Sequence, residues 1–382
     1  MKITDLTVHV LRESDDPTDN REQCALVAVT AEDGTIGYGE ANASPDAVKA
    51  LLESRRGIRG DWDDAPRTIL DSADAMDPAQ TWNRLKAWSF WSCRSGLGHV
   101  ALAGLDMALW DLAGKIAGVP SWELIGPLRN PDPLVYVTLY HGPGDVEATW
   151  KATRQGLDTA LELGFKAAKV EALSKNAAEP GDIVTLVRRA REHVGPDFTL
   201  LLDVGYRWRS AAEAIPIALE VDAYGYLALE APFHPDQVDH YRALHDAIST
   251  PIAAGDMLTS AVEYLPMLDS GAVSIVQGGA ARTGVSEMGE LSRLAAERNL
   301  QFVPWGWVAT TLTVGANIAV AVTQENVPLV EYAPVELYPS ARLPRELAPT
   351  QPELADGRFR TPSKPGLGIE IDPDALERFR VA

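Results

Sequence analysis

Residues 134 to 170 read LVYVTLYHGPGDVEATWKATRQGLDTALELGFKAAKV, and this stretch decides the fold. An apolar run at its start is followed by an amphipathic helical pattern at residues 145–163 and by a second apolar run from residue 165. This succession is typical of a strand–helix–strand unit in which the two strands lie parallel.

Similar units repeat from here almost to the end of the chain. Short apolar runs recur about every 20 to 35 residues, with helical patterns such as residues 286–297 between them. The eight runs are 134–139, 165–170, 199–202, 226–229, 251–254, 273–276, 300–303 and 328–330. Eight buried strands that alternate with helices predict a (β/α)-barrel. The alternative is a doubly wound open sheet, but no Gly-x-Gly-x-x-Gly motif follows the first strand of a unit.

The segment before the barrel has a different pattern. Apolar residues alternate at Leu6, Val8 and Val10, and a turn at residues 32–35 separates two further strand patterns, so we expect an antiparallel meander. Helical patterns follow, and the clearest is residues 101–117.

The chain is therefore expected to have three parts. Residues 1–128 form an α+β domain, and residues 129–333 form the barrel. Residues 334–382 are rich in proline and are expected to pack back on the first domain.

Composition excludes several classes of partner. The formal charge of −20, from 34 basic and 54 acidic side chains, disfavours binding to nucleic acids and to anionic membranes. No apolar run approaches the length of a membrane span, and the start of the chain has no apolar signal core. Two cysteines, Cys24 and Cys93, do not form a disulfide framework, so a reducing, cytoplasmic setting is expected.

Three neighbouring strands end on a carboxylate. Asp203 ends the third run, Glu230 the fourth, and Asp256 follows the fifth. Side chains at the carboxyl ends of barrel strands line the active site, and like charges this close repel unless a cation lies between them. Hard oxygen ligands suit Mg²⁺. Each carboxylate alone could equally cap the next helix, but three in register favour a metal site.

Other polar residues are expected in the same place. Lys169 and Glu171 share one face of the second strand, either beside the metal or as an ion pair at the strand end. Glu331 ends the eighth strand as a candidate inward carboxyl. The candidate substrate-binding residues next to strand ends are Tyr140, His141 and Tyr206, although a purely structural role for His141 is an equal alternative.

Several segments resemble the mandelate racemase and muconate lactonizing group of the enolase superfamily. They are ALAGLDMALWDLAGK at 101–115 with the following GVP at 118–120, the GxxGYGE motif at 34–40, and LDVGYRW at 202–208, LEAP at 229–232 and IAAGD at 252–256. The resemblance spans nearly the whole chain. It implies a modified (β/α)₇β TIM-type barrel with an N-terminal α+β capping domain.

The resemblance also implies a reaction, in which a base removes the proton next to a substrate carboxylate bound to Mg²⁺ and the metal stabilises the enediolate. By position, Asp203, Glu230 and Asp256 become the metal ligands. Lys169 matches the first lysine of a Lys-x-Lys pair, which contacts the substrate carboxylate, and Glu331 matches a carboxyl that hydrogen-bonds the enediolate. The expected partner is a small carboxylate, and relatives of this kind often form homo-oligomers.

Three departures from the family pattern limit the chemistry. Glu171 replaces the second lysine, Gly279 stands where an aspartate is expected, and Trp305 replaces the histidine of the usual dyad and gives the pocket an apolar wall. Racemisation or epimerisation needs proton transfer on both faces, whereas elimination can proceed from one. Dehydration of a hydroxy acid, sugar-acid-like by analogy, or cycloisomerisation is therefore preferred. Lys169 and Glu171 are both candidates for the base; Lys169 is the expected one, with Glu171 supporting it or acting as a further metal ligand.

Two alternatives stay open. The chain could be a non-catalytic, metal-binding descendant, although four retained inward carboxyls argue against this. A phosphate-binding barrel aldolase would need a Schiff-base lysine, for which Lys169 would serve, but it would not need three metal ligands.

Overall fold

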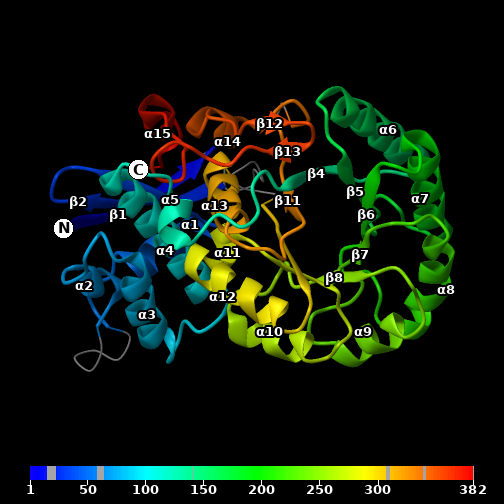
Figure 1. Cartoon of the computed structure of the whole chain (residues 1–382), viewed down its shortest axis with the longest axis horizontal. Helices are drawn as coiled ribbons and strands as arrows, with labels where there is room; N and C mark the ends of the chain where they lie inside the picture. The colour runs from blue at the N-terminus through cyan, green and yellow to red at the C-terminus, as the bar shows by residue number, and fades with distance from the viewer. Residues whose placement is uncertain (15–22, 58–63, 140, 307–309, 339–340, 382) are drawn as a thin grey trace.

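The computed structural model describes residues 1–14, 23–57, 64–139, 141–306, 310–338 and 341–381. A small antiparallel sheet with its helices lies beside a barrel of parallel strands (Figure 1). The predicted fold class, a (β/α)₇β barrel with an α+β capping domain, is confirmed.

The capping sheet is the predicted meander. Its strands β1 (Ile3–Arg12), β2 (Gln23–Ala31) and β3 (Ile36–Ala41) pair antiparallel in chain order. The helices that follow are α1 (Pro45–Leu52), α2 (Pro66–Leu70), α3 (Pro78–Ser89), α4 (Gly96–Ala117) and α5 (Ser121–Ile125).

The glycines of β3 let the sheet lie directly on α4. A Cβ at Gly37 would be 2.3 Å from the carbonyl oxygen of Ala108, and a Cβ at Gly39 would be 2.0 Å from that of Gly104. No side chain fits at such distances, so the glycine spacing is required by the approach of strand to helix.

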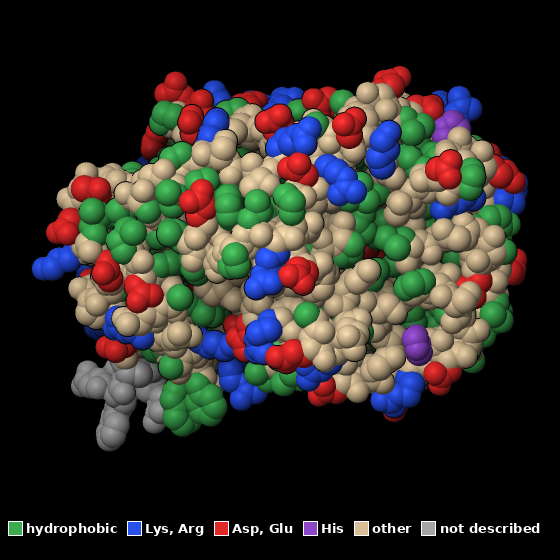
Figure 2. Space-filling view, in the orientation of Figure 1, with side chains coloured by type: hydrophobic (Ala, Val, Ile, Leu, Met, Phe, Trp, Pro, Cys, Tyr) green, Lys and Arg blue, Asp and Glu red, His purple; other side chains and the backbone are tan. Residues whose placement is uncertain are grey.

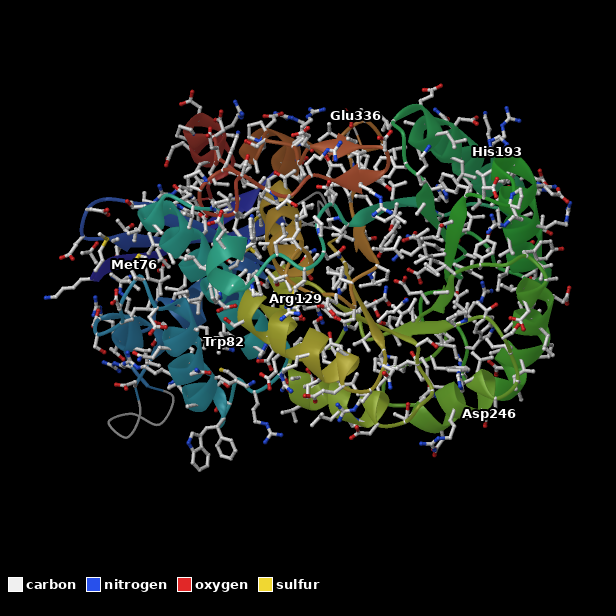
Figure 3. All side chains as sticks on the ribbon, viewed as in Figure 1. Met76, Trp82, Arg129, His193, Asp246 and Glu336 are labelled. Atoms are coloured by element: carbon white, nitrogen blue, oxygen red, sulfur yellow. The ribbon has the colours of Figure 1, made fainter. Side chains whose placement is uncertain are left out.

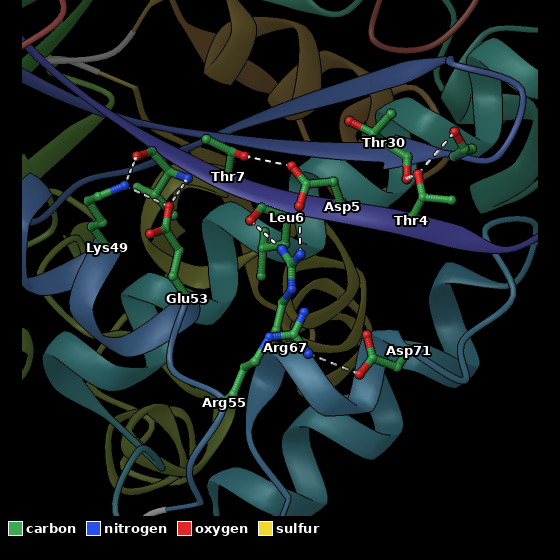
Figure 4. A network of polar contacts seen from close by, with 12 residues as sticks. Thr4, Asp5, Leu6, Thr7, Thr30, Lys49, Glu53, Arg55, Arg67 and Asp71 are labelled. Atoms are coloured by element: carbon green, nitrogen blue, oxygen red, sulfur yellow. Dashed lines mark hydrogen bonds and ion pairs between the residues drawn. The ribbon is translucent and has the colours of Figure 1, made fainter.

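Polar contacts fix α1 and α2 on the outer strand of the cap (Figure 4). The Arg67 guanidinium donates to the backbone oxygen of Leu6 and to Asp5 Oδ1, the latter at 2.6 Å. Lys49 Nζ donates to the backbone oxygen of Val8 at 3.1 Å and to Glu53 at 2.8 Å. These bonds satisfy backbone groups of β1 that have no partner strand on that side.

The barrel consists of seven strand–helix units and an eighth strand. Its strands are β4 (Leu134–Leu139), β5 (Ala167–Glu171), β6 (Thr199–Asp203), β7 (Ala228–Glu230), β8 (Ile252–Ala254), β9 (Ile275–Gly278), β10 (Gln301–Pro304) and β11 (Leu329–Glu331). The helices are α6 (Val146–Glu162), α7 (Pro180–Val194), α8 (Ala211–Asp222), α9 (Val238–His245), α10 (Ala261–Leu268), α11 (Ala280–Thr283), α12 (Val285–Ala296) and α13 (Thr311–Ala321).

The sheet curls back on itself, because β4 to β10 pair in parallel one after another and β11 pairs with β4. The open-sheet alternative is therefore wrong. All eight strands lie where the apolar runs predicted them, within about two residues at each end.

The tail ends in the short helix that its sequence predicts from Pro373, and the part before that helix contains more structure than its proline-rich sequence suggested. It forms α14 (Arg342–Leu347), the two short strands β12 (Leu354–Ala355) and β13 (Arg358–Phe359), and α15 (Pro373–Phe379). β13 adds antiparallel to β4 of the barrel. Val381 donates to the backbone of Val10, and Leu367 donates to the buried Asp111 of α4 at 2.8 Å, so the tail contacts both the barrel and the cap.

Charged side chains are scattered over the face of the molecule shown in Figure 2. Acidic and basic side chains intermingle on the face shown in Figure 2, and His193 lies on the outer side of α7, 2.7 Å from Asp158 (Figure 3). None of the helices in the described part of the chain combines the length and the apolar composition that a membrane crossing needs.

Candidate active site

The polar site follows from two layers of side chains inside the barrel. One residue from each strand forms a buried apolar cluster: Tyr136, Ala167, Leu201, Ala228, Ala253, Ile275, Val303 and Leu329. Side chains alternate along a strand, so the residue two positions further on faces the same interior. That second layer, at the carboxyl ends of the strands, is Thr138, Lys169, Asp203, Glu230, Gly255, Gln277, Trp305 and Glu331. A layer with four charged residues follows a layer with none.

Lys169 lies at the centre of this layer among carboxylates from three other strands. Its Nζ is 2.7 Å from Glu230 Oε1, 3.6 Å from Glu331 Oε1 and 3.7 Å from Asp203 Oδ2. Burial alone would lower the pKa of Lys169, but the negative charges around it outweigh burial and raise the pKa well above its usual value. In this arrangement Lys169 is a protonated cation.

The carboxylates predicted to bind metal lie on adjacent strands. Asp203 and Glu230 are register partners, and Asp256 follows the end of the next strand. Burial, together with negative charge on neighbouring carboxylates, outweighs the charge of Lys169 and raises the pKa of all three, to about 7 for Glu230 and about 6 for Asp256. Carboxylates that raise one another's pKa in this way favour a cation between them.

A test of fit for a metal gives a mixed result. In the described ranges, no group of three or more His, Cys, Asp and Glu side chains is gathered so that it could hold a metal ion. Lys169 takes one oxygen of Glu230, and the Tyr206 hydroxyl donates to Asp256. The donor chemistry still fits, because these are oxygen ligands and Glu230 Oε2 is buried without a hydrogen-bond partner. The three-ligand assignment remains a prediction.

The backbone beside the expected ligands has an uncommon conformation. Tyr206 has φ of 59° and Ala231 has φ of 49°, in the left-handed region that costs energy for residues other than glycine. The backbone N–H of Tyr206 donates to the Ala231 oxygen at 2.6 Å, which ties the two loops together. The turn after β6 thereby brings the Tyr206 hydroxyl to Asp256.

Glu331 and Glu171 occupy different environments. Glu331 accepts from the Thr138 hydroxyl and, at 2.9 Å, from the backbone N–H of Gly306, so it is held in place. Glu171 has an unpartnered buried oxygen, Oε2. Burial, followed by the charge of Asp203, raises the pKa of Glu171 to about 8.

The positions of the usual dyad are closed. A Cβ at Gly279 would lie 2.4 Å from the backbone oxygen of Trp305, so no aspartate fits there without a shift of the chain. Asn317 Nδ2 donates to that oxygen at 2.9 Å and holds it in place. The indole of Trp305 is nearly buried, and its Nε1 has no partner in the described structure.

Two further residues, His141 and Tyr140, are predicted from the sequence to bind substrate. The His141 ring is 2.9 Å from the Thr153 hydroxyl of α6, and burial, then the charge of Lys175, lowers its pKa to about 4. This contact matches the structural alternative for His141. Tyr140 lies outside the described residues.

Gln277 is a site residue that the sequence reasoning missed. It belongs to the second layer, is fully buried, and has no partner for either amide atom. Alternation along β9 places Gln277 on the same face as Ile275, two residues further on. The family pattern gives no signal for Gln277, because at this strand it specifies an aspartate at the position of Gly279.

A cavity of about 730 Å³ opens at the opposite end of the barrel, by the starts of β10 and β11. Arg129 lines it and pairs with Glu325 at 2.7 Å (Figure 3). Barrel active sites lie at the carboxyl ends of the strands, so this cavity is not the catalytic site.

Comparison with known families gives matches over most of the chain. Residues 8–126 match the mandelate racemase / muconate lactonizing enzyme N-terminal domain, and residues 152–375 match the enolase C-terminal domain-like family.

Individual relatives align over nearly their full length. D-galactarolactone cycloisomerase of Agrobacterium fabrum is 27% identical over 392 residues, covering 100% of this chain and 99% of the relative. D-galactonate dehydratase of Cronobacter sakazakii is 27% identical over 393 residues, covering 98% and 94%. The crystal structure of 3,6-anhydro-D-galactonate cycloisomerase from Zobellia galactanivorans has a TM-score of 0.85 and 23% identity over 100% of both chains, which supports the fold.

Proposed function

The chain belongs to the mandelate racemase/muconate lactonizing group of the enolase superfamily, and we propose that it removes the proton next to a substrate carboxylate and then eliminates water from a hydroxy acid. The observation that carries this proposal is the buried Lys169, which lies among carboxylates of three other barrel strands. Such a cluster of opposed charges in a barrel mouth is suited to moving a proton.

Asp203, Glu230 and Asp256 are the residues that would hold Mg²⁺. Bound there, Mg²⁺ would supply the positive charge that offsets the negative charge left on the substrate carboxylate when the adjacent proton is removed. Carboxylate oxygens engaged in this way would no longer hold Lys169 in ion pairs, and Lys169, beside the positive charge of the metal, would have a lowered pKa and release its proton to solvent. A neutral Lys169 Nζ would then be available to contact the substrate and accept a proton.

Lys169 is the proposed base, and Glu171 is its neighbour on the same strand face. As a base, Lys169 accepts the α-proton at Nζ and can return it to the departing hydroxyl on the same face. Glu171 is the second candidate, because its pKa of about 8 lies near neutral pH and its Oε2 has no partner. Comparing Lys169→Ala with Glu171→Gln separates the two, since only loss of the true base stops α-proton exchange.

Elimination is favoured over racemisation because the described residues offer no counterpart of the Asp–His dyad that would serve a second face of the substrate. Gly279 and Trp305 carry no acid or base where the usual dyad would be, and the Trp305 oxygen closes the first position. Two relatives that align over nearly their full length are a sugar-acid dehydratase and a sugar-lactone cycloisomerase, so a sugar acid is the proposed substrate class. Cycloisomerisation is the second candidate, since the 27% identical relative from Agrobacterium fabrum has that activity.

Exchange of the α-proton tests the proposal. The protein is incubated in D₂O with Mg²⁺ and a panel of hexonic and aldaric acids, and deuterium at the carbon next to the carboxylate is measured by NMR. Deuterium or dehydrated product supports the proposal. Bound Mg²⁺ with no exchange across the panel would support the non-catalytic alternative.

The remaining expectations concern the setting of the enzyme. We propose a cytoplasmic enzyme that acts on a small carboxylate as a homo-oligomer. Both cysteines, Cys24 and Cys93, are buried thiols outside any disulfide, as suits a reducing compartment.

A further inference from the structure

The side-chain amide of Gln277 is buried without any hydrogen-bond partner in the described structure. The residue is 0% exposed, and both Oε1 and Nε2 lack a partner. An amide that loses water and gains no partner destabilises the fold, so buried amides are nearly always hydrogen-bonded. Among the described residues none supplies a partner for the Gln277 amide, so the amide can take one from a bound molecule.

The position of Gln277 indicates where that partner lies. Gln277 pairs in register with Val303 of β10 and lies two residues beyond Ile275, whose side chain belongs to the interior cluster. The amide accordingly faces the barrel interior in the same layer as Lys169 and Glu230. The unpartnered Nε1 of Trp305 extends from the next strand, two residues beyond Val303.

We infer that Gln277 is a specificity-determining residue that hydrogen-bonds a hydroxyl group of the substrate, and that the substrate is a polyhydroxy carboxylate. This inference rests on the proposed function. A hydroxyl both donates and accepts, which matches an amide with one free acceptor and one free donor group. The indole N–H of Trp305 can donate to a second oxygen, so the wall expected to be apolar offers three polar atoms in total.

The recognition has a measurable consequence for related acids. A site built to hydrogen-bond a hydroxyl rejects an analogue without that hydroxyl by about 10⁴-fold, because its own buried polar groups are left unpaired. A wholly apolar pocket discriminates by only about 10²-fold. The size of the discrimination therefore distinguishes the two kinds of wall.

The test uses D-galactonate and its 4-deoxy, 5-deoxy and 6-deoxy derivatives as probes. The initial rate at which each acid loses its α-proton in D₂O with Mg²⁺, by exchange or by dehydration, gives kcat/KM with the wild-type protein and with Gln277→Leu. The wild type should reject one deoxy acid by about 10⁴-fold. Gln277→Leu should lower kcat/KM for D-galactonate and reduce that rejection to about 10²-fold or less.

Thermal melting without substrate separates recognition from a structural role. Replacing an unpartnered amide by an apolar group of similar size should leave Tm unchanged or raise it. Asn326 provides the control, because its amide is hydrogen-bonded to Ser292 and Leu300 at the other end of the barrel. Asn326→Leu should lower Tm and leave the rejection of deoxy acids unchanged.

Three results would overturn the inference. They are a Gln277→Leu variant that keeps the full rejection, a lowered Tm of that variant that shows the amide to be satisfied within the fold, and a wild type with equal kcat/KM for D-galactonate and all three deoxy acids. No exchange by the wild type with any acid would instead refute the proposed function, and the inference would fall with it.

Discussion

Replacing Lys169 by methionine should destabilise the protein in the absence of divalent cations. The substitution keeps the approximate length of the side chain but removes the positive charge at Nζ, which lies 2.7 Å from Glu230 Oε1. The Lys169 side chain is only 6% exposed. Glu230, Asp203 and Glu331 would remain buried without their shared cation. Removal of one partner from a buried ion pair costs about 3–5 kcal/mol.

This loss converts into a shift of the melting temperature. The entropy of unfolding is about 2.1 cal/mol/K per residue, or about 0.8 kcal/mol/K for the 382 residues of the chain. A loss of 3–5 kcal/mol therefore lowers Tm by about 4–6 °C in EDTA. Mg²⁺ at 100 times its Kd stabilises a protein by about 2.7 kcal/mol, or about 3 °C here.

The assay is thermal melting followed by circular dichroism, in EDTA and then across a Mg²⁺ titration. The variant should recover more stability from Mg²⁺ than the wild type does, because Lys169 no longer competes for the carboxylates. Arg189→Met is the control, since it removes a surface pair with Glu147, which is 68% exposed, and should cost at most about 1 kcal/mol. Equal melting of Lys169→Met and wild type in EDTA would refute the reasoning, as would a variant that does not respond to Mg²⁺.

Two further predictions concern other parts of the molecule. Gly279→Asp should not create a racemase, because the new Cβ would lie 2.4 Å from the Trp305 oxygen. This overpacking should destabilise the fold by about 1–3 kcal/mol. An unchanged Tm together with racemised product would contradict this prediction. Burial raises the pKa of Glu40 to about 7 despite bonds from Thr310 and Thr313, so the folded protein holds the proton more tightly than the unfolded chain. Stability from this group is present below pH 4.5 and is lost as pH rises to about 7. Glu40→Gln should therefore gain about 2–3 kcal/mol relative to wild type between pH 5 and pH 8, measured by urea unfolding, and a parallel pH profile for the two proteins would count against it.

The sequence predicted the barrel because its strands are buried and separated by long amphipathic helices. Register follows from period two, so Asp203 and Glu230 could be expected side by side, and the structure pairs them. The hairpin β12–β13 gave no such signal, because each strand has only two residues and β13 pairs with β4 at a single position.

Other parts of the site depend on contacts that sequence spacing does not reveal. The ion pairs of Lys169 join residues from four strands, and the most distant partner, Glu331, lies 162 positions further along the chain. The Trp305 oxygen closes the Gly279 position because of how the backbone runs at the ends of the two neighbouring strands β9 and β10. Gln277 could have been found from alternation, but its lack of a partner is visible only in three dimensions.

The most direct test of the central claim is the location of a bound divalent cation. Crystals grown with Mn²⁺ in place of Mg²⁺ give anomalous density that identifies the metal. A single Mn²⁺ contacted by Asp203, Glu230 and Asp256, with Lys169 displaced from Glu230, is the predicted result. An ordered site with Lys169 still paired to Glu230 and no Mn²⁺ among these carboxylates would contradict the account.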